Sequence, residues 1–281
     1  MTVAVITDSA AALPDEVAEE AGVVVVPMWV TVGADTLRDT ELPLPELLRR
    51  ADEGITTSAP SPGDLKEAIE ARLGPEGALV VTVASRMSGS YQAARMAAGS
   101  FGDAVGVLDS GTAAGAQGLV ALAAAGCARL GGSLDDVRAR AERVAARVRL
   151  VASLGDLDWL VRGGHVPEVV AWAGRSLGLR PVIEFKGGRA RSLRPARTEH
   201  RVIERILLEW RKGRTGTAVP HVAAMHGLAE DPAHAVLNRV RAEVEPAESF
   251  LGQFTAVMVS HTGPDLFGLA WWWEEGEGSG P

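Results

Sequence analysis

The chain is poor in cysteine, in aromatic residues and in long apolar runs. Its single cysteine, Cys127, excludes an internal disulfide and favours a cytoplasmic protein. The longest apolar run, residues 23–32, is interrupted by Pro27 and is far shorter than the roughly 20 residues that cross a bilayer. We therefore expect no membrane-spanning segment. No basic leader precedes the first apolar run, so we expect no secretory signal.

Familiar catalytic and cofactor motifs are also missing. The sequence has no Walker loop and no Gly-x-Gly-x-x-Gly after its first apolar run, which argues against nucleotide binding. It has no Gly-x-Ser-x-Gly elbow to support a hydrolase. His200, His221, His226 and His234 lack the spacing of metal ligands, so we expect neither a metal nor a cofactor. Because no aromatic residues alternate with the arginines, nucleic acid is not an expected partner.

The composition is that of an ordinary globular protein with an uneven charge distribution. The 281 residues are 47% hydrophobic and 23% charged, and the chain is long enough for two domains. The net charge is −8, yet 18 basic residues and only 8 acidic ones lie between Arg138 and Arg214. This basic middle segment indicates either solvated helix faces or a surface for an anionic ligand or an acidic partner.

The first half of the chain alternates short apolar runs with helical segments. Strands are predicted at 3–7, 23–32, 79–83 and 105–108, and helices at 14–20, 65–73, 93–98, 113–130 and 134–148. Such alternation is typical of a parallel sheet with helices on both faces. We therefore predict an N-terminal α/β domain over residues 1–148 with a doubly wound parallel sheet. Residues 33–64 are predicted to be a polar excursion from it, with a short helix that ends at Arg50.

The second half is predicted to form another α/β domain over residues 149–273. Helices are expected at 156–165, 169–177, 199–210 and 233–244, strands at 150–154, 222–225 and 255–259, and a hairpin at 180–185 and 189–194. His261 would then follow the end of a strand. The acidic, glycine-rich tail at 274–281 is expected to be disordered.

The segment 86–92 is the first candidate for a binding site. It carries Ser88, Gly89 and Ser90 between a predicted strand and a predicted helix. Free backbone N–H groups at a helix start, together with two hydroxyls, favour an anion. Asp8 and Ser9 end another predicted strand at the same edge of the sheet, where they could contribute to a ligand site or only cap the next helix.

Two further segments carry neutral hydrogen-bond donors. Thr57 and Ser58 precede Pro60 and Pro62, which favour an extended backbone, although such a segment can also be a plain linker. His261 could donate as well, or be an ordinary structural histidine. Hydroxyls suit reversible binding of a carboxylate, because each donates one hydrogen bond without a competing full charge.

Six segments in this order resemble the DegV family of fatty-acid-binding proteins. They are Thr7-Asp8-Ser9, Thr57-Ser58-Ala59-Pro60-Ser61, Ser88-Gly89-Ser90-Tyr91-Gln92-Ala93-Ala94, Asp109-Ser110, Leu157-Asp158-Trp159-Leu160-Val161-Arg162-Gly163-Gly164 and His261-Thr262-Gly263-Pro264. Each segment alone is a weak signal. Their common order and spacing, from about residue 3 to residue 270, make the resemblance specific.

The resemblance implies a two-domain DegV-like α/β fold that holds one long-chain fatty acid in a tunnel between the domains. It assigns the carboxylate to Thr57, Ser88 and His261, and places Arg197 in the same polar network. Ser58 and Gly89 belong to the same two loops and complete the set of expected ligand-binding residues. The resemblance further implies a carrier that is not itself an enzyme. A separate ATP-dependent fatty acid kinase would convert the bound acid to an acyl phosphate for phospholipid synthesis.

Three positions depart from the family pattern. His165 stands in place of an arginine, Asp265 in place of a glycine, and Ala59 in place of a glutamine. The run Trp271-Trp272-Trp273 is expected to pack internally or to form an exposed apolar edge.

Two other classes of function stay open from the sequence. One is a serine-dependent lipid hydrolase or acyltransferase that would use Ser88 and His261. The other is an interaction module that would dock a partner through the basic middle segment.

Overall fold

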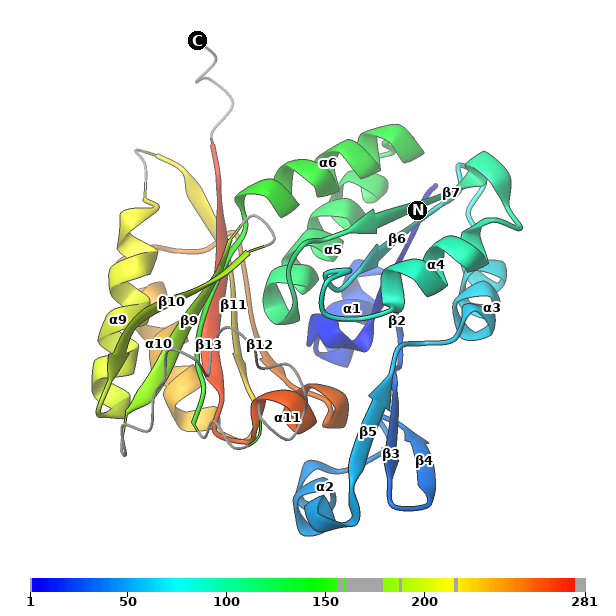
Figure 1. The fold of residues 1–281 in the computed structure, drawn as a ribbon. Coiled ribbons are helices and arrows are strands. Elements are labelled where there is room, and N and C mark those ends of the chain that lie inside the picture. The colour runs from blue at the N-terminus through cyan, green and yellow to red at the C-terminus, as the bar shows by residue number, and fades with distance from the viewer. Residues whose placement is uncertain (1, 156–158, 160–178, 187–188, 215–216, 276–281) are drawn as a thin grey trace.

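Three sheets and the helices that cover them make up the fold, which we describe from a computed structural model (Figure 1). The structure describes residues 2–155, 159, 179–186, 189–214 and 217–275. Within these residues no helix is long and apolar enough to cross a membrane. The helices predicted at 156–165 and 169–177, and the tail from residue 276, lie outside the described residues apart from Trp159.

The first sheet is parallel and has four strands in the order β2-β1-β6-β7. Its strands are β1 (Ala4–Asp8), β2 (Val23–Val26), β6 (Ala78–Thr82) and β7 (Val105–Asp109). Helices α1 (Asp15–Ala21), α5 (Ala114–Arg129) and α6 (Leu134–Arg147) lie on one side, and α3 (Pro62–Arg72) and α4 (Ser90–Ala98) on the other. β1 and β6 are buried along their whole length, which confirms the prediction of central strands covered on both faces.

The second sheet is antiparallel, small, and inserted into the first half of the chain. Its order is β4-β3-β5, with β3 (Trp29–Val32), β4 (Asp35–Arg38) and β5 (Ile55–Ser58), and α2 (Leu44–Arg49) connects β4 to β5. The run at 23–32 is thus two strands in two different sheets, separated at Pro27, whose missing N–H cannot join a ladder. The strands β4 and β5 were not predicted. Short 3-10 helices occur at Ser9–Ala11, Ala51–Glu53 and Gly102–Ala104.

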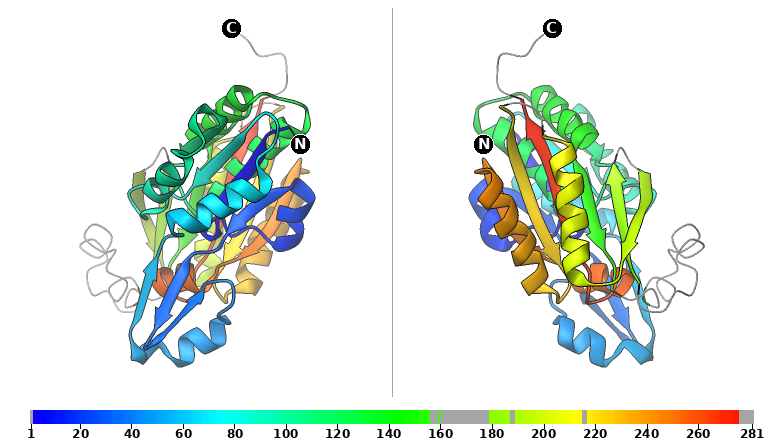
Figure 2. Two further views of the ribbon diagram at one scale, coloured as in Figure 1. Left: turned by 90° about the vertical axis from the view of Figure 1, so that its right-hand side faces the viewer. Right: turned by 90° about the vertical axis from the view of Figure 1, so that its left-hand side faces the viewer.

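The third sheet has six strands in the order β10-β9-β8-β13-β11-β12. They are β8 (Arg149–Ser153), β9 (Arg180–Lys186), β10 (Arg189–Ala196), β11 (Val219–His226), β12 (Glu248–Gln253) and β13 (Phe267–Glu274). Helices α9 (Glu199–Lys212) and α10 (Glu230–Glu243) cover its outer face, on the opposite side of the molecule from α3 and α4 (Figure 2). The predicted hairpin is confirmed as β9 and β10, whereas β12 and β13 were not predicted.

The segment predicted as a strand at 255–259 is a helix, so that prediction was wrong. Helix α11 spans Ala256–Thr262, and Thr255 precedes it with an extended backbone. The valines of this segment suggested a strand, but its buried residues are Ala256, Val257, Val259 and Ser260, a spacing that lines one side of a helix. His261 therefore lies in the last turn of a helix and does not follow a strand.

The tryptophan run 271–273 packs internally, which is one of the two alternatives that the sequence left open. It belongs to β13, a central strand between β8 and β11. Trp271 and Trp272 are both buried but point to opposite faces. Trp271 meets Trp210 edge to face at 5.9 Å, and Trp272 stacks on His221 at 4.2 Å.

Helix α5 joins the first and third sheets. It contacts β1 on one side and β11 and β13 on the other, and one apolar cluster includes residues of both sheets. Gly115 allows this approach, because a Cβ at that position would lie 2.7 Å from the Cβ of Ala223. The predicted domain limit between residues 148 and 149 falls at the connection from α6 to β8 and stays a prediction.

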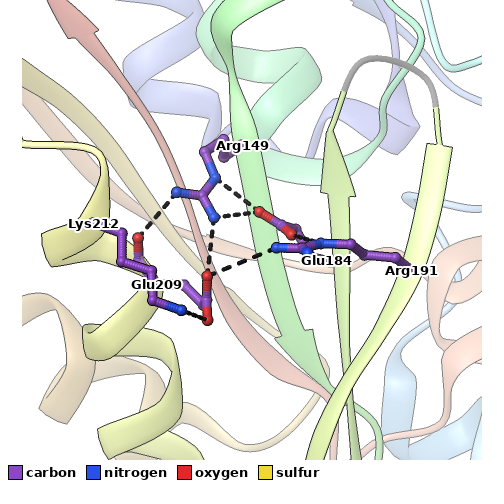
Figure 3. Close-up of polar contacts among 5 residues, drawn as sticks. All are labelled: Arg149, Glu184, Arg191, Glu209 and Lys212. Carbon is purple, nitrogen blue, oxygen red and sulfur yellow. Dashed lines mark hydrogen bonds and ion pairs between the residues drawn. The ribbon is translucent and has the colours of Figure 1, made fainter.

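Part of the basic middle segment is engaged in a buried charge cluster at the third sheet (Figure 3). Arg149 donates to Glu184 with its Nε at 2.8 Å and pairs with Glu209 at 3.2 Å. Arg191 also pairs with Glu184, and Lys212 pairs with Glu209 at 2.6 Å. The cluster connects β8, β9 and β10 to the end of α9. Because Glu184 and Glu209 are buried, removal of a single cation would leave an uncompensated charge.

Candidate functional site

The strongest long-range polar contact of the predicted site joins Thr57 and His261. The hydroxyl of Thr57 lies 2.8 Å from Nε2 of His261, although the two residues are 204 positions apart in the sequence. Thr57 comes from the edge strand β5, and His261 from the last turn of α11. Both side chains are half-buried, so they are accessible from one side. The structure thus brings together two of the three residues that the resemblance assigned to a carboxylate.

The loop that carries Ser88 lies against the end of β5. A Cβ placed on Gly89 would lie 4.0 Å from the Cβ of Ala59, so the two loops are in contact. Ser88 is half-buried, and Gly89 is exposed. Ser58 follows Thr57 on the opposite face of β5 and is exposed. Its predicted contact with a ligand is not tested by this placement and stays a prediction.

Within the serine loop, the two hydroxyls contact each other. The Oγ atoms of Ser88 and Ser90 are 3.0 Å apart, and the backbone N–H of Ser90 donates to Ser88 Oγ at 3.2 Å. Ser90 is the first residue of α4 and is fully buried. One of the free N–H groups expected at this helix start therefore donates to Ser88 itself, and either hydroxyl can be the donor in the contact between Ser88 and Ser90.

A clamp of three side chains holds the segment that follows Thr57. Asp64 accepts hydrogen bonds from Arg38 at 2.6 Å and from Trp29 Nε1 at 3.0 Å, and the Arg38 guanidinium lies 3.7 Å from the Trp29 ring centre. Asp64 and Ser61 also form a capping box at the start of α3. The hydrogen bond from Arg38 is the main reason that the pKa of Asp64 lies well below its usual range. The clamp thereby connects β3 and β4, which precede Thr57 in the chain, to α3, which follows it.

A buried aspartate, Asp39, links the start of α11 to the first sheet. Its carboxylate accepts from the Ser9 hydroxyl at 2.7 Å and from the Met28 N–H at 2.9 Å, and its carbonyl accepts from the Ala256 N–H at 3.3 Å. Burial raises the pKa of Asp39 above the usual value. These contacts fix where α11 begins and therefore where His261 is presented.

Asp8 is a second buried carboxylate, at the end of β1. Its side chain accepts from the N–H of Val83, from the N–H of Ala10 and from the amide of Gln117. Burial raises its pKa to about 6, although Gln117 and the backbone donors lower it. The sequence predicted the position of Asp8 at this edge of the sheet, but not its burial or its bond to Gln117. Its contact with Ala10 caps the short 3-10 helix that begins at Ser9, in line with the capping alternative, whereas a contribution of Asp8 and Ser9 to a ligand site stays a prediction.

The remaining predicted residues lie elsewhere or outside the described part. Arg197 is exposed in the bend between β10 and α9, and no described hydrogen bond or ion pair links it to Thr57 or Ser88. Asp265 is exposed in the turn between α11 and β13 and packs against Gly155. His165 lies outside the described residues. The assignment of Arg197 to the polar network therefore stays a prediction.

The chemistry of this site is that of hydrogen-bond donors to an anion. Hydroxyls and one imidazole meet at half-buried positions, and no metal-binding group of His, Cys, Asp or Glu occurs among the described residues. The Nε2 atom of His261 contacts Thr57, whereas the Ser88 hydroxyl contacts Ser90. This pairing differs from a nucleophilic serine held by its histidine base.

The fold is that of a mixed α/β protein with a parallel sheet and a larger, mostly antiparallel sheet, and its site pairs the Thr57 hydroxyl with His261 beside the serine loop. A model of the family described as "Uncharacterised protein, DegV family" matches residues 2–274. The chain belongs to the DegV family. A DegV domain-containing protein of Streptomyces coelicolor is 34% identical over 273 residues, which cover 95% of this chain and 97% of that protein.

Solved structures of relatives have the same fold. A DegV family protein from Thermus thermophilus, described for its fatty acid binding, is 31% identical and has a TM-score of 0.88, covering 97% of this chain and 100% of the other. DegV of Bacillus subtilis, described as a fatty acid binding protein, is 28% identical with a TM-score of 0.82, covering 98% and 100%. The predicted family and fold class are thereby confirmed.

Proposed function

We propose that this protein is a cytoplasmic carrier that binds one long-chain fatty acid and holds its carboxylate at Thr57, Ser88 and His261. The observation that carries the proposal is the 2.8 Å contact between Thr57 and His261, beside the loop of Ser88. Relatives that are about 30% identical over nearly the whole chain are described as fatty acid binding proteins, which supports the same class of ligand here.

The acyl chain would provide most of the affinity. Burial of ~15 methylene groups at roughly 0.8 kcal/mol each amounts to on the order of 12 kcal/mol before ordering costs. We place this chain between the two large sheets, whose facing residues belong to one apolar cluster. The hydroxyls would then determine the orientation of the ligand and disfavour esters, which cannot offer a full negative charge.

The carrier would act with a separate ATP-dependent fatty acid kinase, which forms the acyl phosphate used in phospholipid synthesis. The half-buried position of Thr57, Ser88 and His261 supports this role, because a carboxylate held there could still be reached by a partner. The carrier would catalyse no step of its own. We expect Ser88→Ala to lower kinase-dependent phosphorylation of the acid more than it lowers retention of the acyl chain. Equal losses would indicate that the loop is only structural.

The direct test is extraction of the protein after expression in bacteria. Denaturing extraction and mass spectrometry should release close to one fatty acid per chain, and delipidated protein should take up palmitate or oleate. A clean extract without uptake of either acid would contradict the proposal. A fluorophosphonate probe distinguishes the serine hydrolase alternative, because only a hydrolase would be labelled in a way that depends on Ser88.

A further inference from the structure

The parallel sheet ends in an open edge at β7. No described strand pairs with the outer side of β7. Sheet edges are commonly protected from other strands by charged residues, a proline or a bulge. The edge strand β10 has such protection, because it carries three arginines, Pro195 and a register shift. In contrast, β7 has a regular register and no proline, and its one charged side chain, Asp109, accepts from the N–H groups of Ser85 and Gly111.

The backbone groups of Val107 are directed toward this open edge. The N–H of Ser110 donates to the carbonyl of Thr82 on β6 at 3.2 Å, and the carbonyl of Leu108 accepts from the Thr82 hydroxyl at 3.4 Å. Ser110 and Leu108 therefore direct their backbone groups toward β6. Because successive residues of a strand direct their N–H and C=O groups to opposite sides, those of Val107 are directed outward. An additional strand would find one donor and one acceptor there.

A groove follows this edge between two helices. Helices α4 and α6 contact β7 from opposite faces of the sheet (Figure 1). The groove has a volume of about 380 Å³, and residues of α4, β7 and α6 line it. Tyr91, Arg95 and Ala98 come from one side of α4, because positions i, i+4 and i+7 share a helix face, and Arg138 comes from α6. Since one water occupies roughly 30 Å³ of the liquid, the groove is far larger than a single bound ion.

Two arginines give the groove a positive charge. Both Arg95 and Arg138 are exposed, and none of the residues that line the groove is acidic. Among the described residues, no hydrogen bond or ion pair engages Arg95. Arg138 pairs with Glu142 on its own helix at 3.2 Å, an exposed pair of a kind that contributes little to stability. Because the side chains of a strand alternate between two faces, an extended ligand on β7 would direct side chains both toward α4 and toward α6.

We infer that this edge binds an extended acidic segment of a partner protein, which pairs with β7 as an additional strand and places its carboxylates on Arg95 and Arg138. In such strand addition, main-chain hydrogen bonds give affinity and side-chain contacts give specificity. Charge complementarity favours an acidic segment. A second copy of this chain is disfavoured, because pairing of two β7 edges would bring the arginines of both copies together. The groove includes none of Thr57, Ser88 and His261, so the inference does not depend on the proposed function.

The test is fluorescence anisotropy of a labelled probe peptide, Val-Thr-Glu-Glu-Glu-Val-Thr, with the full chain. A peptide with glutamines in place of the glutamates should bind at least about fivefold more weakly. Arg95→Gln and Arg138→Gln should each lower the affinity by about two- to fivefold, the equivalent of one exposed ion pair. The double variant Arg95→Glu, Arg138→Glu should instead prefer a peptide with lysines in place of the glutamates.

Arg143→Gln is the matched control for these variants. Arg143 is exposed on the same helix as Arg138 but does not line the groove, so its replacement should leave the affinity unchanged. Equal binding of the glutamate and glutamine peptides, an equal loss in Arg143→Gln, or no binding at millimolar peptide would overturn the inference. Displacement of the peptide by inorganic phosphate, beyond the effect of chloride at equal ionic strength, would indicate a site for a small anion and would overturn it as well.

Val107→Pro tests the pairing of strands separately. Proline removes the outward N–H, which is not part of the ladder with β6, and is tolerated at a sheet edge for that reason. This variant should bind the peptide at least about fivefold more weakly, whereas Val107→Thr retains the N–H and should bind within about twofold of the wild type.

Hydrogen exchange keeps the inference testable if Val107→Pro does not fold. In the wild type, the Val107 N–H should exchange at least about tenfold more slowly when the peptide is bound, and unchanged exchange would refute the pairing. Fatty acid uptake should be the same in Arg95→Gln as in the wild type. A failure of the inference would therefore leave the carrier function intact.

Discussion

Replacement of Thr57 by valine tests the proposed carboxylate site with a minimal change. Valine keeps the branched shape of threonine and its preference for a strand but removes the hydroxyl that lies 2.8 Å from His261 Nε2. A hydrogen bond to a charged group contributes about 1.5–3 kcal/mol. At 1.4 kcal/mol per factor of ten, the affinity for a fatty acid should fall by about 10- to 150-fold. The free energy of unfolding of Thr57→Val should fall by at most about 1 kcal/mol, because water can reach the half-buried imidazole.

Thr56→Val is the matched control for this substitution. Thr56 precedes Thr57 in β5, points to the opposite face and is exposed. The same chemical change there should alter affinity by less than about twofold, since exposed positions rarely contribute more. Thr57→Ser retains the hydroxyl and should recover most of the loss. Affinity is measured by displacement of a fluorescent fatty acid, and urea denaturation checks that all three variants are folded.

The comparison of these variants decides whether Thr57 contacts the ligand. If Thr57→Val and Thr56→Val bind within about twofold of each other, the hydroxyl makes no contact with the carboxylate. If Thr57→Ser binds as weakly as Thr57→Val, a hydroxyl at this position does not restore binding, and the loss cannot be assigned to the missing hydrogen bond. Either result would refute the carboxylate site drawn from the pair of Thr57 and His261.

Three further predictions concern stability. Asp64→Ala should lower the free energy of unfolding by about 1–2 kcal/mol, because it removes a helix cap and the partner of Arg38. Asp136→Ala removes a capping box of the same type at α6 and should cost less, and equal costs in urea denaturation would argue against the clamp. Trp271→Ala should cost about 3–5 kcal/mol, because the side chain is fully buried; a loss below about 1 kcal/mol would show that the sheet is not packed as described. Burial lowers the pKa of His226, so stability should decrease as the pH falls below about 6.5, and a thermal-melting series should show this decrease weakened in His226→Asn.

Much of the first half of the fold could be predicted from local sequence. The apolar runs of β1, β6 and β7 have no alternation because both faces of the parallel sheet are covered, and that pattern is local. The hairpin of β9 and β10 was likewise predicted from two short runs around a turn. The break at Pro27 between two strands could also be expected from the residue type alone, because proline lacks the N–H that a strand needs.

Other elements depended on burial that the sequence does not display. Residues 256–262 carry valines that suit a strand, yet they form α11 because one side of that helix is buried against β3 and α2. The strand β13 was missed because its tryptophans point alternately into two different apolar clusters. Its sequence therefore lacks the alternation of apolar and polar residues that marks a half-buried strand. Short strands such as β4 have too few residues for a period to be read.

The sequence by itself determined the family, the α/β class and three residue types suited to an anion, because these depend on short motifs and on the order of segments. Only the tertiary structure decided that Thr57 and His261 touch, since 204 residues separate them and the contact requires an antiparallel sheet, a helix and Asp39 to be placed together. It also decided that Asp8 is buried and bonded to Gln117 and Val83. A buried carboxylate is recognised only when the groups that exclude water from it are in position.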